Sequence, residues 1–328
     1  MKIEELYQLF LSAEGICTDT RNIVPGSIFF ALKGANFNGN EYASKAIVEG
    51  CVAAIIDEEE YSGENIYCVN DVLTALQELA LFHRRKFDIP IIGITGSNGK
   101  TTTKELIGAV LEKKYNLLYT LGNLNNHLGV PFTLLRLNKS HEMAIIEMGA
   151  NKPGDIKELS EIAEPTHGII TNIGAAHIEG FGSIDGVIKT KTELYRNIAE
   201  NSGELFYNAD DTVLIENLPR GIKTTTYSIN ASSVIQGKVS SLNPYLNFEW
   251  SKKGLDIQKV ESQLVGAYNL PNFLAAICIG DYFGVPTDLI NTALSEYAPS
   301  NNRSQITKTD KNTLVVDCYN ANATSIMK

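Results

Sequence analysis

Ile91-Ile92-Gly93-Ile94-Thr95-Gly96-Ser97-Asn98-Gly99-Lys100-Thr101-Thr102-Thr103-Lys104 is the stretch that decides the fold predicted for this chain. The apolar residues 89–94 are typical of a buried parallel strand, and the residues from Thr101 onward predict a helix. The glycines between them let backbone N–H groups approach an anion, towards which the helix directs the positive end of its dipole. The stretch therefore predicts a strand, a phosphate-binding loop and a helix.

The loop carries the residue types of a nucleotide site. In such loops the lysine meets the β- and γ-phosphates and the following hydroxyl binds magnesium, which gives these roles to Lys100 and Thr101. The common pattern also places a glycine where this chain has Ile94. A glycine turn that binds no ligand is the alternative. The residues predicted to contact the nucleotide here are Gly96, Ser97, Asn98, Gly99, Lys100, Thr101 and Thr102.

The bulk composition is that of an ordinary globular protein. A length of 328 residues suits two or three domains. The formal net charge of −10 argues against nucleic acid or an anionic membrane as the main partner. The five cysteines are odd in number and widely spaced, which favours reduced thiols. Since we find no leader-like start and no apolar run long enough to span a membrane, we expect a cytoplasmic protein.

The region ahead of the phosphate loop predicts a small α/β unit. Apolar runs at residues 27–32 and 52–56 predict strands, and residues 41–49 predict an amphipathic helix. Two polar segments, residues 17–21 and 33–40, lie between these elements. On their own they favour capped turns, because Asn-Gly and Thr-Asp-Thr are turn-forming sequences.

The central region, up to about residue 218, alternates strands with helices, which predicts a mainly parallel sheet with helices on both faces. Strands at residues 143–146 and 168–171 end at Glu147 and Asn172. Ligands of such sheets bind at the carboxyl ends of the strands, so a carboxylate there is a candidate magnesium ligand. A helix cap or a surface charge is the alternative for Glu147.

Two further basic positions follow in this region. The loop after Asn172 carries His177, and a helix predicted over residues 184–199 carries Lys189 and Lys191. A lone loop histidine is more often structural than a ligand. His177, however, follows a strand that ends at the proposed phosphate site, where a second metal ion or a phosphate would meet it.

The last third of the chain offers one more candidate pair. Asn269 and Asn272 open a predicted helix three residues apart, so they share a face on which amide groups are suited to reading a base edge. A helix cap followed by a surface asparagine is the alternative. Beyond it, residues 299–304 resemble a linker and residues 313–316 predict a strand. We therefore predict three domains, over residues 1–87, 88–298 and, incomplete, 299–328.

Taken together, the motifs resemble the Mur ligases, and within that family the members that add D-alanyl-D-alanine. The resemblance covers nearly the whole chain and is carried by residues 18–21, 29–40, 93–102, 122–126, 147, 171–177, 191 and 268–272. Residues 122–131 and the ending Asp317-Cys318-Tyr319-Asn320-Ala321-Asn322 differ from the members that add lysine or diaminopimelate. The chain departs from the family pattern at Tyr268, Cys318 and Ala323, and none of these has a predicted catalytic role.

The resemblance implies a fold and a reaction. The fold is α/β, with a small N-terminal UDP-binding domain, a central P-loop ATPase domain with a mainly parallel sheet, and the start of a truncated Rossmann-like domain. The reaction is ATP-dependent: D-alanyl-D-alanine (D-Ala-D-Ala) is added to UDP-N-acetylmuramoyl-tripeptide through an acyl phosphate, in peptidoglycan precursor synthesis. Nucleic acid and membrane insertion play no part, and a monomer is expected.

The resemblance also implies roles for individual residues. The catalytic residues are Lys100, Glu147, His177 and Lys191. The ligands of Mg²⁺ are Thr101, Glu147, His177 and Lys191, the last as a carbamylated lysine. ATP also meets Asn269 and Asn272 at the adenine and Arg303 at the phosphates. The UDP-linked substrate meets Thr20, Arg21, Lys33, Asn38, Asn40, Asn123, Asn125 and Asn126.

Three other functions remain open at this point. The lysine- or diaminopimelate-adding Mur ligase and folylpolyglutamate synthase share the ATP core. A non-catalytic module that binds a nucleotide sugar is the alternative from another class. Because residues 299–328 are too few to form a core of their own, we expect a chain of this extent to bind the UDP-linked tripeptide and to ligate poorly.

Overall fold

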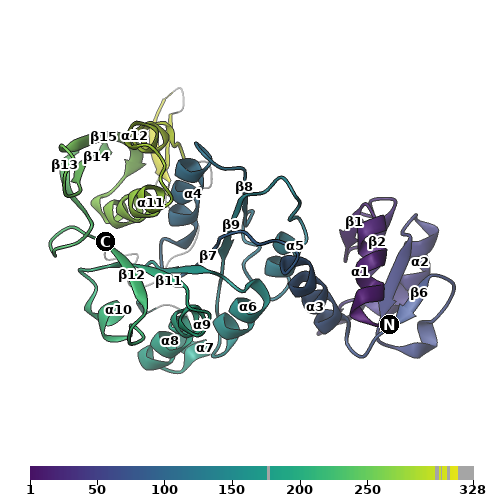
Figure 1. The fold of residues 1–328 in the computed structure, drawn as a ribbon. Coiled ribbons are helices and arrows are strands. Elements are labelled where there is room, and N and C mark those ends of the chain that lie inside the picture. The colour runs from purple at the N-terminus through teal and green to yellow at the C-terminus, as the bar shows by residue number, and fades with distance from the viewer. Residues whose placement is uncertain (176–177, 300–302, 304, 309–310, 317–328) are drawn as a thin grey trace. The chain divides into compact units, whose positions relative to one another are not determined.

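The computed structural model describes residues 1–175, 178–299, 303, 305–308 and 311–316. Backbone contacts divide the chain into two compact units (Figure 1). The first unit contains Met1–Asp88 and His127–Leu137, and the second contains Ile89–Asn126 and the described part of Asn138–Lys328. The separate third domain from residue 299 onward stays a prediction. No helix among the described residues is long and apolar enough to cross a membrane.

The first unit is built on a parallel four-stranded sheet in the order β1-β2-β5-β6. Its elements are α1 (Ile3–Ser12), β1 (Gly15–Cys17), β2 (Ser27–Phe30), β3 (Lys33–Gly34), β4 (Phe37–Asn38), η1 (Gly39–Tyr42), α2 (Ala43–Val48), β5 (Ala53–Ile56), η2 (Glu59–Tyr61), β6 (Ile66–Cys68), α3 (Val72–Arg84) and α5 (Gly129–Leu134). Every residue of β2 and β5 is buried, as expected for central strands. The two strands predicted in this region are confirmed.

A histidine ties three segments of the first unit together. His83 lies on α3, and its Nδ1 shares a hydrogen bond with the Tyr7 hydroxyl of α1 (3.2 Å). Its Nε2 lies 2.9 Å from the carbonyl oxygen of Leu137. Helix α5, which ends three residues before Leu137, packs against α3. Burial lowers the pKa of His83, which keeps the ring neutral. Residues 127–137 are thereby fixed to the first unit although they follow the phosphate loop in sequence.

The second unit is built on a nine-stranded sheet in the order β15-β14-β13-β12-β11-β10-β7-β9-β8. Its strands are β7 (Ile91–Thr95), β8 (Leu117–Tyr119), β9 (Met143–Glu147), β10 (His167–Ile170), β11 (Glu204–Asn208), β12 (Lys223–Ser228), β13 (Ile235–Leu242), β14 (Tyr245–Ser251) and β15 (Gln258–Val265). Neighbours from β8 to β13 pair in parallel, and β13, β14 and β15 pair antiparallel. The predicted mainly parallel sheet is confirmed.

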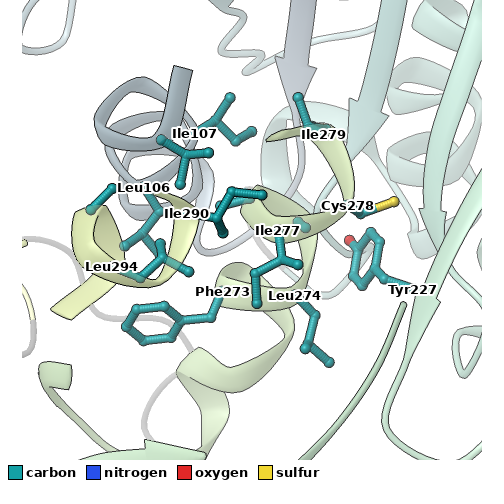
Figure 2. Packing of buried hydrophobic residues seen from close by; sticks show 14 of the residues in the cluster. Leu106, Ile107, Tyr227, Phe273, Leu274, Ile277, Cys278, Ile279, Ile290 and Leu294 are labelled. Atoms are coloured by element: carbon teal, nitrogen blue, oxygen red, sulfur yellow. The ribbon is translucent and has the colours of Figure 1, made fainter. Parts of the chain in front are cut away.

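Helices cover both faces of this sheet. One layer consists of α4 (Lys100–Leu111), α11 (Leu270–Tyr282) and α12 (Thr287–Glu296), and the other of α6 (Asp155–Ala163), α8 (Ile184–Lys191) and α9 (Glu193–Glu200). The shorter helices are α7 (Ile178–Phe181), α10 (Thr212–Glu216) and η3 (Ala267–Asn269). Figure 2 shows how α4, α11 and α12 pack against one another: Leu106, Ile290 and Phe273 meet in one apolar cluster. This packing holds the N-terminus of α4, where the phosphate loop ends, in a fixed place.

The helix predicted over residues 184–199 is two helices. Thr192 separates α8 from α9 with φ −74° and ψ −2°, and its hydroxyl donates to the carbonyl oxygens of Ile188 (2.8 Å) and Lys189 (3.2 Å). Such back-bonding slightly destabilises a helix and often bends it, although Thr190 makes the same bond inside α8. The strand predicted at residues 313–316 is confirmed as β17 (Thr313–Val316), which pairs antiparallel with β16 (Gln305–Lys308).

Candidate active site

The phosphate loop connects β7 to α4 and depends on two glycines. Gly99 has φ +79° and caps the helix. Gly96 has φ +148°, and a Cβ there would lie 1.9 Å from the hydroxyl oxygen of Thr171. Both positions therefore require glycine, the first for its backbone conformation and the second also for lack of space. The predicted loop is confirmed as a strand-to-helix turn.

Thr171 and Asn172, which follow β10, form hydrogen bonds with the phosphate loop. The backbone N–H of Ser97 donates to the carbonyl oxygen of Asn172 (2.9 Å). The Asn172 side chain accepts from Asn98 N (3.1 Å) and donates to Asn98 O (2.9 Å). The Thr171 hydroxyl donates to the same carbonyl (2.6 Å). The end of β10 thus holds the loop in shape.

Lys100 and Thr101 begin α4 at the mouth of the loop. The Lys100 ammonium donates to the carbonyl oxygen of Gly96 (2.7 Å), so it curls back over the loop. Burial lowers the pKa of Lys100, and the nearby Arg303 charge adds to this while Glu147 opposes it. The Thr101 hydroxyl donates to Glu147 Oε1 (3.2 Å). The structure therefore brings together four of the predicted residues: the loop lysine, the hydroxyl, the carboxylate and the arginine.

Glu147 is the last residue of β9 and is 1 % exposed. Its Oε1 accepts from the Thr101 hydroxyl and from Asn125 Nδ2 (2.8 Å). Its Oε2 is buried and has no hydrogen-bond partner in the described part of the chain. The Lys104 ammonium, also buried, lies 3.6 Å from this Oε2. One carboxylate oxygen of Glu147 therefore accepts two hydrogen bonds, and the other faces the Lys104 ammonium.

The donors at this point fit Mg²⁺. A carboxylate with an unbonded oxygen and an adjacent hydroxyl are hard oxygen ligands, which this ion prefers. Among the described residues no three His, Cys, Asp or Glu side chains gather into a metal cluster. Magnesium sites at phosphates commonly have one or two protein ligands, completed by phosphate oxygens and water. His177, predicted as a further ligand, lies outside the described residues.

Lys191, the last residue of α8, is 3 % exposed. Burial, and to a smaller extent the charge of Lys100, lower its pKa from 10.5 to about 7 against the opposing effect of Asp155. Its ammonium lies 5.9 Å from the centre of the Phe181 ring. Lys189, two residues earlier, is exposed. The structure thus buries the one lysine that was assigned a modification and leaves its neighbour in solvent.

The two asparagines predicted to contact adenine form hydrogen bonds within the protein. Asn272 Oδ1 accepts from the Thr103 hydroxyl (3.1 Å), and its Nδ2 donates to Asn269 Oδ1 (2.9 Å). Asn269 Nδ2 in turn donates to the carbonyl oxygen of Val265 (2.8 Å). Asn272 also lies against Gly99, where a Cβ would come within 2.9 Å of its Oδ1. Asn272 therefore ties α11 to the phosphate-loop helix, Asn269 holds Asn272, and contact with adenine stays a prediction.

The predicted UDP contacts of the first unit occupy two places. Arg21 is exposed, with 84 % of its side chain in solvent, and pairs with Asp19 (2.7 Å). Hydrogen bonds from Arg21 lower the pKa of Asp19 to about 2. Thr20 lies beside them and is partly buried. This segment presents a guanidinium to solvent at the carboxyl end of β1.

Lys33, Asn38 and Asn40 form the second place. The Lys33 ammonium lies 3.0 Å from Asp57 Oδ1 and 3.3 Å from Glu58 Oε1. Asn40 is fully buried: its Nδ2 donates to Asn38 Oδ1 (2.8 Å) and Asp57 Oδ1 (2.9 Å), and its Oδ1 accepts from Asp57 N (2.9 Å). Asn38 donates to Glu58 (2.9 Å). The network fixes the segment that carries these residues to the end of β5.

The three remaining predicted substrate contacts lie in different surroundings. Asn125 belongs to the Glu147 site, whereas Asn123 and Asn126 are exposed. Sequence reasoning missed Lys104, Thr103 and Asp57. Lys104 had a usable signal, because it follows Lys100 by one helical turn and so shares its face. Thr103 and Asp57 act on partners distant in sequence, and no local pattern indicates them.

Comparisons with known proteins match most of the chain. The family described as "Mur ligase middle domain" matches residues 94–280, and "Mur ligase family, catalytic domain" matches residues 12–84. A UDP-N-acetylmuramoyl-tripeptide–D-alanyl-D-alanine ligase of Synechocystis is 39 % identical over 289 residues, 87 % of this chain and 61 % of the relative. The ligase of the same name from Bacillus subtilis is 36 % identical over 317 residues, 95 % and 68 % respectively.

Solved structures give the same picture. MurF from Acinetobacter baumannii superposes with a TM-score of 0.89 at 29 % identity, covering 99 % of this chain and 74 % of that one. MurF from Thermotoga maritima, solved in complex with ADP, gives 0.87 at 27 % identity, covering 97 % and 74 %. The chain thus spans between about three fifths and three quarters of these relatives.

Proposed function

This chain belongs to the Mur ligase family, and on that premise we propose that it acts in the ATP-dependent ligation of D-Ala-D-Ala to UDP-N-acetylmuramoyl-tripeptide. The observation that carries the proposal is the grouping of Lys100, Thr101 and Glu147 at the carboxyl ends of β7 and β9. The activity for which the relatives are named supplies the substrates. A reducing compartment such as the cytoplasm suits the described cysteines, which are free thiols.

The reaction needs positioning and charge neutralisation more than covalent help. The tripeptide carboxylate attacks the γ-phosphorus of ATP, ADP leaves, and an acyl phosphate forms; the dipeptide amine then displaces phosphate. Lys100 and the loop amides hold the phosphate oxygens, and Arg303 adds positive charge beside Lys100. Thr101 and Glu147 would hold the magnesium ion, which neutralises charge on the transferring phosphoryl group.

We propose that Lys191 carries a carbamate. A protonated lysine would repel a metal ion, whereas a carbamate is an anionic oxygen ligand. Carbon dioxide adds only to the neutral amine, and a pKa of about 7 makes that form abundant at neutral pH. His177 is the proposed partner of this group at a second metal ion. A lysine kept buried without chemistry is the alternative.

The first unit supplies the proposed UDP site. Arg21 and Lys33 are the cations available for a diphosphate there. The Lys33 ammonium is shared with Asp57 and Glu58, so a diphosphate must compete with two carboxylates for it. Asn40 would act by holding this segment in place, since its amide is used internally.

Product mass tests the proposal. The chain is incubated with Mg²⁺, ATP, UDP-N-acetylmuramoyl-tripeptide and D-Ala-D-Ala, and the UDP-linked pentapeptide is expected at low yield, in keeping with the poor ligation expected of a chain of this extent. Product from UDP-N-acetylmuramoyl-dipeptide with lysine or diaminopimelate would assign the chain to the other Mur ligase. Calorimetric titrations with ADP and with the UDP-linked tripeptide run in parallel. Binding of the UDP ligand without binding of ADP would support the nucleotide-sugar-binding module instead.

A further inference from the structure

Lys104 is a fully buried lysine whose charge faces the proposed metal ligand. It lies on α4 one turn after Lys100, and both it and Glu147 have side chains that are 2 % exposed. The Lys104 ammonium is 3.6 Å from Glu147 Oε2, which is too long for a normal hydrogen bond. Two buried opposite charges at this separation neutralise each other, and removing one would leave the other uncompensated.

The two oxygens of Glu147 have different partners. Oε1 accepts hydrogen bonds from Thr101 and Asn125, so its position is fixed. Oε2 accepts none from the described residues, and the Lys104 ammonium lies 3.6 Å from it. An oxygen that is buried, charged and not hydrogen-bonded is available to a cation without first breaking a hydrogen bond. The ammonium of Lys104 holds that place electrostatically.

The wider site is rich in positive charge. Lys100 lies within electrostatic reach of both Glu147 and Arg303, and Lys191 is within reach of Lys100. Glu147 therefore lies among several cations, and the Asp155 carboxylate is within reach of Lys191. Such a site attracts a polyphosphate and repels a free divalent cation. A nucleotide that enters brings negative charge to Lys100 and Arg303, and so removes the penalty for a metal ion beside Glu147.

We propose that Lys104 is an internal counter-ion of Glu147 that prevents free Mg²⁺ from binding and makes the metal bind together with the nucleotide. This role rests on the proposed function, because it concerns the magnesium site assigned there. Lys104 touches neither nucleotide nor substrate in this scheme. It is a positioning residue that acts through the charge of Glu147.

Binding of Mn²⁺ in place of Mg²⁺, measured by electron paramagnetic resonance without nucleotide, tests the inference. Lys104→Met keeps the length of the side chain and removes the charge. We expect its affinity for Mn²⁺ alone to rise at least about tenfold, because a unit charge a few ångströms away is removed from a weakly screened site. Lys113→Met, a partly exposed lysine paired with Glu296, is the matched control and should bind Mn²⁺ as the wild type does.

The double variant Lys104→Met with Glu147→Gln locates the effect. It should lose the gain, since the metal would have no carboxylate. A gain that survives in the double variant, or equal Mn²⁺ binding by Lys104→Met and wild type, overturns the inference. If Lys104→Met unfolds without metal, its melting temperature is followed with Mn²⁺. Recovery of several degrees in the variant and not in the wild type supports the inference, and absence of recovery overturns it.

Titration of ADP separates this result from the proposed function. Wild-type protein that fails to bind ADP in the presence of Mn²⁺ contradicts the nucleotide site itself. Wild-type protein that binds ADP with Mn²⁺, alongside a Lys104→Met variant without the gain, contradicts the role of Lys104 alone. In the expected case, ADP raises the Mn²⁺ affinity of wild type much more than that of Lys104→Met.

Discussion

Lys100 is the residue on which the proposed chemistry depends most directly. Its ammonium lies over the loop, 2.7 Å from the carbonyl oxygen of Gly96, where transferring phosphoryl oxygens would meet it. We predict that Lys100→Ala lowers ATP turnover at least about 100-fold, the usual cost of losing one group that stabilises developing charge. The affinity for the UDP-linked tripeptide should stay within about twofold, because the candidate contacts of the uridine end lie in the first unit.

Phosphate release and calorimetric titration measure these two quantities. Lys113→Ala serves as the control, since that side chain is paired at the surface with Glu296. Unchanged turnover in Lys100→Ala would remove the phosphate-loop assignment. Equal loss of both quantities would instead indicate a folding defect.

Lys191 gives a second prediction at the scale of one side chain. Lys191→Ala should lose most of its activity, and short carboxylates such as acetate or formate should restore a part, because they replace the oxygen ligand of the carbamate. Lys189→Ala is the matched control, two residues away on the exposed side of the same helix. Full activity of Lys191→Ala, or an inactive Lys189→Ala, contradicts the carbamate.

Sequence reasoning identified a single residue where a chemically suitable side chain stands at the end of a predicted strand or helix. Glu147 was predicted because it ends a strand beside the loop, and the structure places it against Thr101. Asn269 and Asn272 were correctly placed on one helix face, but the use of their amides was not foreseen. The partner of Asn272 is Thr103, 169 residues earlier, and periodicity carries no information about such a contact.

At the scale of elements, His83 provides a test of how the first unit is held together. Its folded-state pKa is lowered by burial, so the folded unit binds fewer protons than the unfolded chain as the pH falls through about 6.5. The stability that His83 provides is therefore fully present above that pH and is lost below it. We predict that the melting temperature of the first unit falls between about pH 7.5 and about pH 5.

Scanning calorimetry across this pH range measures the effect. His83→Gln keeps hydrogen-bonding capacity and removes the titration, so its melting temperature should be lower at neutral pH and should change less with pH. The neutral ring bridges α1 to Leu137, so losing it should weaken the attachment of residues 127–137. An equal pH dependence in wild type and His83→Gln would contradict the role assigned to this residue.

Elements were predicted well where burial dictates a continuous apolar run. Strands β7 and β9, buried at every residue, agree with the apolar runs that predicted them. The break between α8 and α9 was missed, because threonine is compatible with a helix and no local pattern marks Thr192 as the position of a break. The strand order of the nine-stranded sheet was not predicted either. Apolar patterns identify strands but do not say which strands are neighbours.

At the scale of the whole molecule, the division into two units predicts two separable responses to ligands. The UDP-linked tripeptide should raise the melting temperature of the first unit, and ADP with Mg²⁺ that of the second, since a ligand stabilises the part that binds it. The single tryptophan, Trp250, is buried in the second unit and reports its unfolding by fluorescence.

Calorimetry records both transitions and fluorescence identifies the second. Each ligand is expected to shift one transition by several degrees at saturating concentration and the other by clearly less. A larger shift of the tryptophan transition than of the first-unit transition by the UDP ligand would contradict the assignment of its uridine end to the first unit.

The first unit is built from two separate segments of the chain, and this affects how the chain folds while it is being synthesised on the ribosome. The first unit includes His127–Leu137, so it cannot be completed until residue 137 has been made. By then β7 has already emerged, whereas its sheet neighbours β9 and β10 begin only at residues 143 and 167. At about 5 to 20 residues per second, this apolar strand lacks both neighbours for several seconds. The nascent chain, rather than the finished protein, is therefore the species most exposed to aggregation, and the one on which a ribosome-associated chaperone would act.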